Sequence, residues 1–232
     1  DDWFLVNLDD PEIVKRCAEL PCRRVTFSLD QPADVCVKED QVWLFDQPLF
    51  ALSDLHLPGR HNLQNAMVAA AMAVKLGVDG DQIREGIRAF KGVEHRIEFV
   101  AEIRGARYYN DSKGTNVDAT TVALKAFEKP VILLAGGYDK KTGFDGLKPV
   151  LDRVATMIVY GETRDQLKAL RQDAIVVETL SEAVEQAYQL AKDGDIVLLS
   201  PVCASWDQFT DYEQRGRQFK EQVLALARQA GE

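Results

Sequence analysis

The chain has 232 residues, 46% of them hydrophobic and 28% charged, with a formal net charge of −9 at pH 7. This size predicts one large or two small domains with a sizeable core, and the acidic balance argues against a general binder of nucleic acid or membrane surfaces. We find no apolar run near the roughly 20 residues of a membrane helix, and no signal peptide in the acidic opening DDWFLVNLDD.

The first part of the chain predicts short strands followed by a helical pair. A strand in WFLVNL and an Asp-rich turn precede a helix at residues 10–19. RRVTFS predicts a strand, and DVCVKE and QVWLFD alternate apolar and polar residues around Glu39-Asp40, which predicts a hairpin. QPLFALSDLHL predicts another extended run. Alanine-rich residues 62–77 and amphipathic residues 79–92 predict two helices that end at glycine.

The rest of the chain alternates between strands and helices. Two strand candidates, RIEFVAEI and ARYYND, are joined by Arg104-Gly105. Four apolar, β-branched strands follow: VILLAGG, TMIVYG, AIVVE and DIVLLSP. Helices are predicted at residues 116–128, 145–153, 163–171, 181–192 and 212–230. Strands of this kind are typical of a parallel sheet buried on both faces, so the pattern predicts an α/β fold with a doubly wound, Rossmann-like sheet. We place a domain boundary near residue 93, between domains at 1–93 and 94–232.

Three polar clusters follow predicted strands. They are NDSKGTN after ARYY, GGYDKKTGF after VILLA, and SPVCASWDQFTDYEQRG after DIVLL. Ligands of doubly wound sheets bind at the carboxyl ends of the strands. The fold is therefore expected to bring the three clusters together on one edge of the sheet.

Cysteine and histidine do not predict a metal site. The cysteines, Cys17, Cys22, Cys36 and Cys203, lack CxxC spacing, which favours free thiols in a cytoplasmic protein. The histidines, His56, His61 and His95, are not spaced as a ligand cluster.

For several polar residues, a structural role is the alternative to ligand binding. Thr115, Asn62 and Ser205 are candidates for helix N-caps. Arg96 is either a salt-bridge residue or a phosphate clamp. Lys140 and Lys141 either bind an anion or lie on solvated surface. Capping does not explain Asp111 and Lys113, so NDSKGTN favours a ligand site.

Five segments in register resemble the Mur ligase family. They are GRHNLQNAMVAAAMA, HRIEFV, NDSKGTN, LLAGGYDKKTGF and LLSPVCASWDQFTDYEQRGRQF. The last three are most similar to members that add D-glutamate to UDP-N-acetylmuramoyl-L-alanine. The resemblance implies a cytoplasmic, monomeric, ATP-dependent ligase of peptidoglycan precursor synthesis that uses Mg²⁺ and acts through an acyl phosphate. It also implies that residues 1–93 are the later part of a central ATPase domain.

The resemblance also implies roles for individual residues. Asn62 and Asn65 would face adenine, and Arg96, Asp111 and Lys113 would hold the ribose and phosphates of ATP. The D-glutamate pocket would comprise Thr115, Lys140, Ser205 and Tyr212. No catalytic residue and no metal ligand is assigned.

The chain also departs from the family pattern. It contains no G-x-x-x-x-G-K-[ST] sequence, so we expect it to be a C-terminal part of a ligase, inactive alone. Tyr212 replaces a common phenylalanine and Gly114 a common alanine, and Tyr138-Asp139 leaves the register of Lys140 against Lys141 open. The alternatives are a sibling Mur or folylpolyglutamate-type ligase, or a non-catalytic module that binds a nucleotide or an amino acid.

Overall fold

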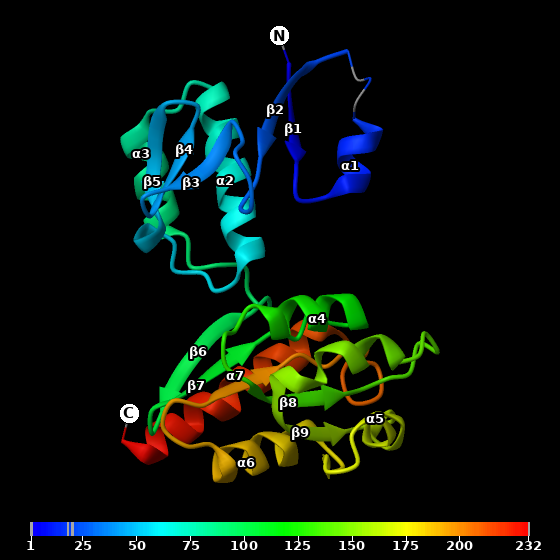
Figure 1. Ribbon diagram of the computed structural model, residues 1–232. Helices are drawn as coiled ribbons and strands as arrows, with labels where there is room; N and C mark the ends of the chain where they lie inside the picture. Colours follow the sequence, from blue (N-terminus) through cyan, green and yellow to red (C-terminus); the bar gives the residue numbers. More distant parts are fainter. Residues whose placement is uncertain (1, 18, 20, 232) are drawn as a thin grey trace. The chain divides into compact units, whose positions relative to one another are not determined.

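The computed structural model describes residues 2–17, 19 and 21–231 and divides the chain into two compact units, Asp1–Lys91 and Gly92–Glu232. Figure 1 labels most of their helices and strands. In the described part of the first unit, the strands are β1 (Trp3–Asn7), β2 (Arg23–Phe27), β3 (Val35–Lys38), β4 (Gln41–Leu44) and β5 (Gln47–Ala51). Its helices are α1 (Pro11–Arg16), the 3₁₀ turn η1 (Leu52–Asp54), α2 (Arg60–Lys75) and α3 (Gly80–Ala89).

The first unit is built on one sheet with the order β1-β2-β3-β4-β5. The first three strands are parallel and the last three antiparallel. Glu39 and Asp40 both have positive φ, 50° and 60°, as a two-residue hairpin turn requires, so the predicted hairpin is confirmed. The helix expected at 10–19 spans only Pro11–Arg16, and residues 18 and 20 lie outside the described part of the chain.

The second unit follows the predicted alternation. Its described strands are β6 (Glu98–Ile103), β7 (Ala106–Asn110), β8 (Val131–Gly136), β9 (Val154–Tyr160), β10 (Ile175–Val176) and β11 (Ile196–Leu199). Its described helices are α4 (Val117–Lys125), η2 (Asp145–Arg153), α5 (Arg164–Leu170), α6 (Leu180–Leu190) and α7 (Tyr212–Ala230).

The sheet of this unit has the order β10-β9-β8-β11-β7-β6. All its pairs are parallel except β6 with β7, which form an antiparallel hairpin at one edge. The predicted doubly wound α/β fold is therefore confirmed. β11, the last strand of the chain, lies between the first two parallel strands, β7 and β8. This insertion creates the point where the chain changes winding direction, and ligands of such sheets bind there.

Both faces of this sheet are covered. Leu133 of β8 belongs to a core that includes residues of α4, η2 and α5, whereas its neighbour Leu134 belongs to a core that includes residues of α6 and α7. Figure 1 shows α4 and α6 on opposite sides of the strands. Because successive side chains of a strand point to opposite faces, a strand between two helical layers is apolar throughout, which explains the sequence VILLAG.

Three expected elements differ in detail. The helix at residues 145–153 is a 3₁₀ helix that contains Pro149, whose ring cannot be accommodated in the interior of an α-helix without strain. The strand expected in AIVVE is only two residues long. β6 begins at Glu98 because His95 and Ile97 have positive φ, 65° and 45°, which places this segment in a turn. Among the described residues, no helix is both long and apolar enough to cross a membrane.

Candidate functional site

The three polar clusters meet at the carboxyl ends of β7, β8 and β11. The hydroxyl of Ser200, after β11, donates to Oδ2 of Asp111, after β7, at 2.7 Å. The N–H of Gly136, at the end of β8, donates to the carbonyl of Pro201 at 3.0 Å, and Tyr138 N–H donates to Ala204 O at 2.9 Å. Segments separated by dozens of residues thus contact one another at one edge of the sheet.

Gly136 and Gly137 permit this close approach. Both have positive φ, 147° and 137°, and a Cβ would lie 2.0 Å from Tyr160 O at Gly136 and 2.2 Å from Ala204 O at Gly137. Only glycine fits such positions. The paired glycines are therefore explained by neighbouring backbone of the protein itself.

The side chain of Arg215, on α7, connects two of the clusters by hydrogen bonds. This side chain is fully buried. Nε donates to Ser112 Oγ at 2.9 Å and Nη2 to Ser112 O at 2.8 Å, while Nη1 donates to the carbonyls of Cys203 and Ala204, both at 3.1 Å. The planar guanidinium can serve several acceptors at once. Sequence reasoning missed this residue, although Arg215 lies four residues before Phe219 and eight before Val223 on the buried face of the helix.

Asp111 is held within the NDSKGTN turn. Only 4% of the residue is exposed, and its two carboxylate oxygens accept from Ile97 N–H at 3.3 Å and from the Ser200 hydroxyl. Burial raises the pKa of Asp111 to about 6, against the opposing effect of these two hydrogen bonds. A buried carboxylate with a perturbed pKa at the strand ends is typical of a functional site.

The variant Asp111→Asn is expected to stabilise the second unit at pH 8. The raised pKa means that the folded state binds more protons than the unfolded state between pH 3.8 and about 6. The free energy of unfolding therefore falls as pH rises through this window, by about 3 kcal/mol at most. Asparagine avoids this cost but gives up one acceptor oxygen, so we expect a net gain of about 1–2 kcal/mol.

Urea unfolding at pH 8 and pH 4 tests this expectation. The gain should largely disappear near pH 4, because the folded carboxyl is protonated there and the unfolded carboxyl is close to its ordinary pKa of 3.8, so little of the cost remains. Glu128→Gln, which alters an exposed carboxylate, is the matched control and should change little at either pH. A loss of stability at pH 8 would show that the Asp111 hydrogen bonds outweigh its burial.

Of the residues expected to bind D-glutamate, Thr115, Lys140 and Ser205 lie on these turns and Tyr212 is the first residue of α7. Thr115 and Tyr212 are half-buried, Ser205 is buried and Lys140 is exposed. Thr115 is not a helix cap, because the side chain of Asn116 caps α4 by accepting from Ala119 N–H at 2.8 Å. Nor does Ser205 cap α7, whose N-cap is Asp211. The capping alternatives for Thr115 and Ser205 are therefore wrong.

Lys140 and Lys141 differ in their backbone. Lys141 has a positive φ of 59°, and its N–H donates to Asp139 Oδ1 at 2.6 Å. Asp139 Oδ2 also accepts from Gln166 at 3.1 Å. The backbone of Lys141 is thus part of the turn that carries Lys140, and both side chains are exposed.

The residues expected to bind ATP occur in both units. In the first unit, Asn62 donates from its amide to Pro58 O at 2.7 Å, and Asn65 is exposed on α2. The N-cap of α2 is Gly59, so the capping alternative for Asn62 is also wrong. In the second unit, Arg96 and Lys113 are exposed cations.

Lys113 is tied to two neighbours within the second unit. Its N–H donates to His95 O at 3.0 Å, so the Lys113 backbone and the turn that carries Arg96 are held together. Its Nζ lies 5.3 Å from the centre of the Tyr212 ring. The Lys113 side chain therefore stands beside a residue of the expected D-glutamate pocket.

A polar network around His95 was not predicted. Asn110 Nδ2 donates to His95 Nδ1 at 2.9 Å and to Glu98 Oε2 at 3.1 Å, while Asn110 Oδ1 accepts from Ser112 N–H at 3.1 Å. The Ser112 N–H fixes the orientation of the amide, which makes His95 Nδ1 an acceptor and the ring neutral. Burial also lowers the pKa of His95.

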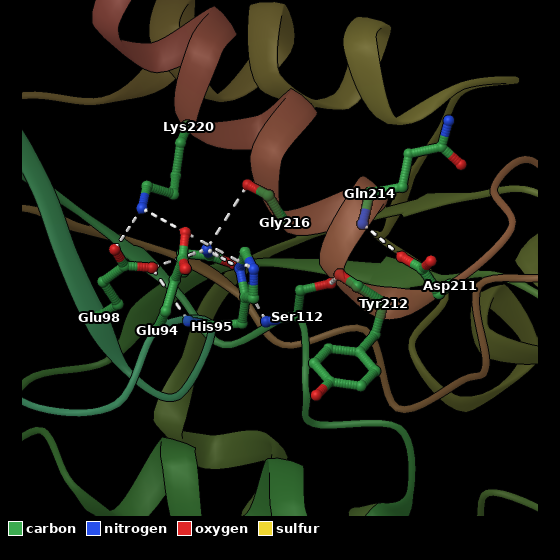
Figure 2. Close-up of polar contacts among 10 residues, drawn as sticks. Glu94, His95, Glu98, Ser112, Asp211, Tyr212, Gln214, Gly216 and Lys220 are labelled. Atoms are coloured by element: carbon green, nitrogen blue, oxygen red, sulfur yellow. Dashed lines mark hydrogen bonds and ion pairs between the residues drawn. The ribbon is translucent and has the colours of Figure 1, made fainter.

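His95 lies close to Glu94 and Glu98, with potential metal-ligand atoms within 4.8 Å of one another. The sequence did not predict this group. Lys220 already donates to Glu94 Oε1 at 3.0 Å and to Glu98 Oε1, as Figure 2 shows. The ammonium group of Lys220 thus occupies the place between the carboxylates that a metal ion would need. The group also does not fit Mg²⁺, which prefers six oxygen ligands.

The strand ends therefore define an α/β protein in which three polar turns meet at one edge of the sheet, and comparison with known proteins shows its family. The model of the Mur ligase middle domain matches residues 1–73, and that of the Mur ligase, glutamate ligase domain, matches residues 95–203. The chain belongs to the Mur ligase family. Members of this family are ATP-dependent ligases.

Curated relatives match along almost the whole chain. The UDP-N-acetylmuramoylalanine--D-glutamate ligase of Caldanaerobacter subterraneus subsp. tengcongensis is 42% identical over 238 residues, which cover 98% of this chain and 53% of the relative. The ligase of the same name from Lactobacillus acidophilus is 41% identical, with 94% and 50% covered. The chain thus spans about half the length of the curated relatives it matches.

Solved structures support the fold. The MurF ligase from Thermotoga maritima in complex with ADP has a TM-score of 0.67 at 16% identity and covers 99% of this chain and 54% of its own. A pseudomurein peptide ligase type C from Methanothermus fervidus has a TM-score of 0.68 at 16% identity, with 94% and 56% covered. At these identities, the likeness concerns the fold alone.

Proposed function

We propose that this chain is part of an ATP-dependent ligase that adds D-glutamate to UDP-N-acetylmuramoyl-L-alanine during peptidoglycan precursor synthesis. In this proposal the first unit is the later part of the central ATP-binding domain and the second unit receives D-glutamate. The observation that carries it is the convergence of three polar turns at the ends of β7, β8 and β11. Relatives with about 40% identity that are named as D-glutamate ligases support it.

The second unit supplies what a dicarboxylate requires. Lys140 would bind one carboxylate through a charge-assisted hydrogen bond, and the hydroxyls of Thr115 and Ser205 would donate further hydrogen bonds. Tyr212 would close the side of the pocket next to Lys113. Asp111 would act on the nucleotide side, because a second carboxylate beside D-glutamate would repel it.

These residues would orient the amine of D-glutamate for amide formation. ATP, as a substrate, would supply the phosphoryl group that activates the acceptor carboxylate. Arg96 and Lys113 would hold its phosphates, the remaining lone pairs of Asp111 would accept hydrogen bonds from the ribose hydroxyls, and Asn62 and Asn65 would contact adenine. Mg²⁺ would be bound with the phosphates, as is usual for this ion, rather than by the Glu94–His95–Glu98 group.

We further propose that the enzyme works as a monomer in the cytoplasm, where ATP and nucleotide-linked substrates are present. Its partners in this proposal are the three small-molecule substrates, with neither nucleic acid nor membrane involved.

An amino-acid panel tests the proposed function. A longer protein, comprising this chain and the half of its relatives that this chain does not cover, is given ATP, Mg²⁺ and UDP-N-acetylmuramoyl-L-alanine. D-glutamate should be ligated at least about 100-fold faster than L-glutamate, meso-diaminopimelate or L-lysine, since a misplaced carboxylate loses about 3 kcal/mol of charge-assisted contacts. This chain alone should form no product.

Other outcomes would overturn the proposal. Preference for meso-diaminopimelate or L-lysine would identify a sibling ligase, and L-glutamate added to a folate acceptor would identify a folylpolyglutamate-type enzyme. Nucleotide binding with no product from any amino acid would identify a non-catalytic module.

A further inference from the structure

The turn from Glu94 to Glu98 has an unfavourable backbone. His95 and Ile97 have positive φ, 65° and 45°, a region that residues with a Cβ rarely adopt and that is least suited to a β-branched residue. Arg96 lies between them and is exposed. Such a conformation persists only where surrounding contacts hold it.

Glu98 supplies part of that hold. Its Oε2 accepts from the His95 N–H at 3.0 Å and from Asn110 at 3.1 Å, and its Oε1 accepts from Lys220. The side chain of Glu98 is 19% exposed and that of Lys220 25%. This ion pair is therefore largely shielded from solvent, unlike a surface pair that contributes little.

Lys220 supplies a second part of that hold. Its ammonium group on α7 also donates to Glu94 at 3.0 Å, so it joins the carboxylates at the two ends of the turn, as Figure 2 shows. Without a cation between them, the two like charges would repel each other and favour opening of the turn.

The Glu94–Glu98 turn also positions residues of the site. The carbonyl of His95 accepts the Lys113 N–H at 3.0 Å, and the N–H of Ile97 donates to Asp111 at 3.3 Å. The His95 ring also stands edge-on to Tyr212, with ring centres 6.0 Å apart. A displaced turn would therefore move Arg96 and release the backbone of Lys113.

We propose that Lys220 is a positioning residue. By bridging Glu94 and Glu98 it holds the strained turn that presents Arg96 and fixes Lys113, and thereby sets the affinity for the nucleotide. The structural part of this inference rests on the contacts above, and its effect on ATP rests on the proposed function.

Hydrogen exchange in this chain tests the structural part. In Lys220→Met, the Lys113 amide should exchange about tenfold faster or more, because its bond to His95 O opens more often. The amides of β8 should keep their exchange rates. Lys125→Met, which alters an exposed lysine of α4, should leave both unchanged, and Lys220→Arg should restore slow exchange because arginine can also bridge two carboxylates.

Kinetics of the longer protein test the consequence. Lys220→Met should raise the KM for ATP about tenfold, as loss of one charge-assisted phosphate contact would, and change the KM for D-glutamate less than about twofold. Lys220→Arg should restore the KM for ATP. Unchanged exchange at Lys113, or an equal rise in both KM values, or an unaltered KM for ATP, would overturn the inference. Absence of ligase activity in the unsubstituted protein, with faster exchange in Lys220→Met, would instead contradict the proposed function.

Discussion

Replacing Arg215 with alanine is expected to lower the free energy of unfolding of the second unit by about 3–5 kcal/mol. The change leaves the buried carbonyls of Ser112 and Cys203 without the donor they now have, and it removes one of the two donors to the carbonyl of Ala204. Each unsatisfied group costs about 1–3 kcal/mol, and the vacated volume adds to the loss. Arg215→Lys should recover at most about half of it, because an ammonium group cannot reproduce the planar fork.

Trp206 provides the measurement, since the other two tryptophans, Trp3 and Trp43, lie in the first unit. With both of those replaced by phenylalanine, urea unfolding followed by Trp206 fluorescence reports the second unit. Arg217→Ala is the matched control, because Arg217 is exposed two residues further along the same helix; it should cost less than about 0.5 kcal/mol. A loss below about 1 kcal/mol for Arg215→Ala would show that the clusters are held together by other contacts.

In the longer protein, Lys140→Ala is expected to raise the KM for D-glutamate about 10- to 150-fold. This factor corresponds to the 1.5–3 kcal/mol of a hydrogen bond to a charged group, at 1.4 kcal/mol per tenfold. The KM for ATP should stay nearly unchanged, because the nucleotide contacts are assigned to other residues.

Lys141→Ala is the matched control for this prediction. Both lysines are exposed, but Lys141 contributes a backbone hydrogen bond to the turn, which alanine retains. If Lys141→Ala alone impaired D-glutamate binding, the assigned register of the turn would be off by one residue. If neither variant had an effect, the GGYDKKTGF turn would not belong to the pocket.

The fold of the second unit could largely be predicted from its sequence. Alternation of apolar strands with helices indicated a parallel sheet with both faces covered, and Leu133 and Leu134 indeed face opposite helical layers. The order of strands could not be predicted in this way. Nothing in DIVLLSP indicates that β11 pairs with both β7 and β8, yet this pairing brings the three turns together.

The candidate site, too, was predicted in part from the sequence. Residues of the turns were predicted because polar groups are concentrated after apolar strands. Arg215 was missed because charged residues are usually exposed, even though helical spacing from Phe219 and Val223 places it on the buried face of α7. The contacts of Lys220 depend on positive φ values at His95 and Ile97, which no sequence pattern indicated.

In the proposed function, the ends of β7, β8 and β11 hold D-glutamate. A crystal structure of the longer protein with D-glutamate, ADP and UDP-N-acetylmuramoyl-L-alanine tests it most directly. We expect one carboxylate of D-glutamate within about 3 Å of Lys140 Nζ, the charge-assisted hydrogen-bond distance, and the hydroxyls of Thr115 and Ser205 within hydrogen-bond reach of the ligand, with Asp111 turned towards the nucleotide. D-glutamate bound elsewhere, with these side chains in contact only with solvent, would contradict the claim.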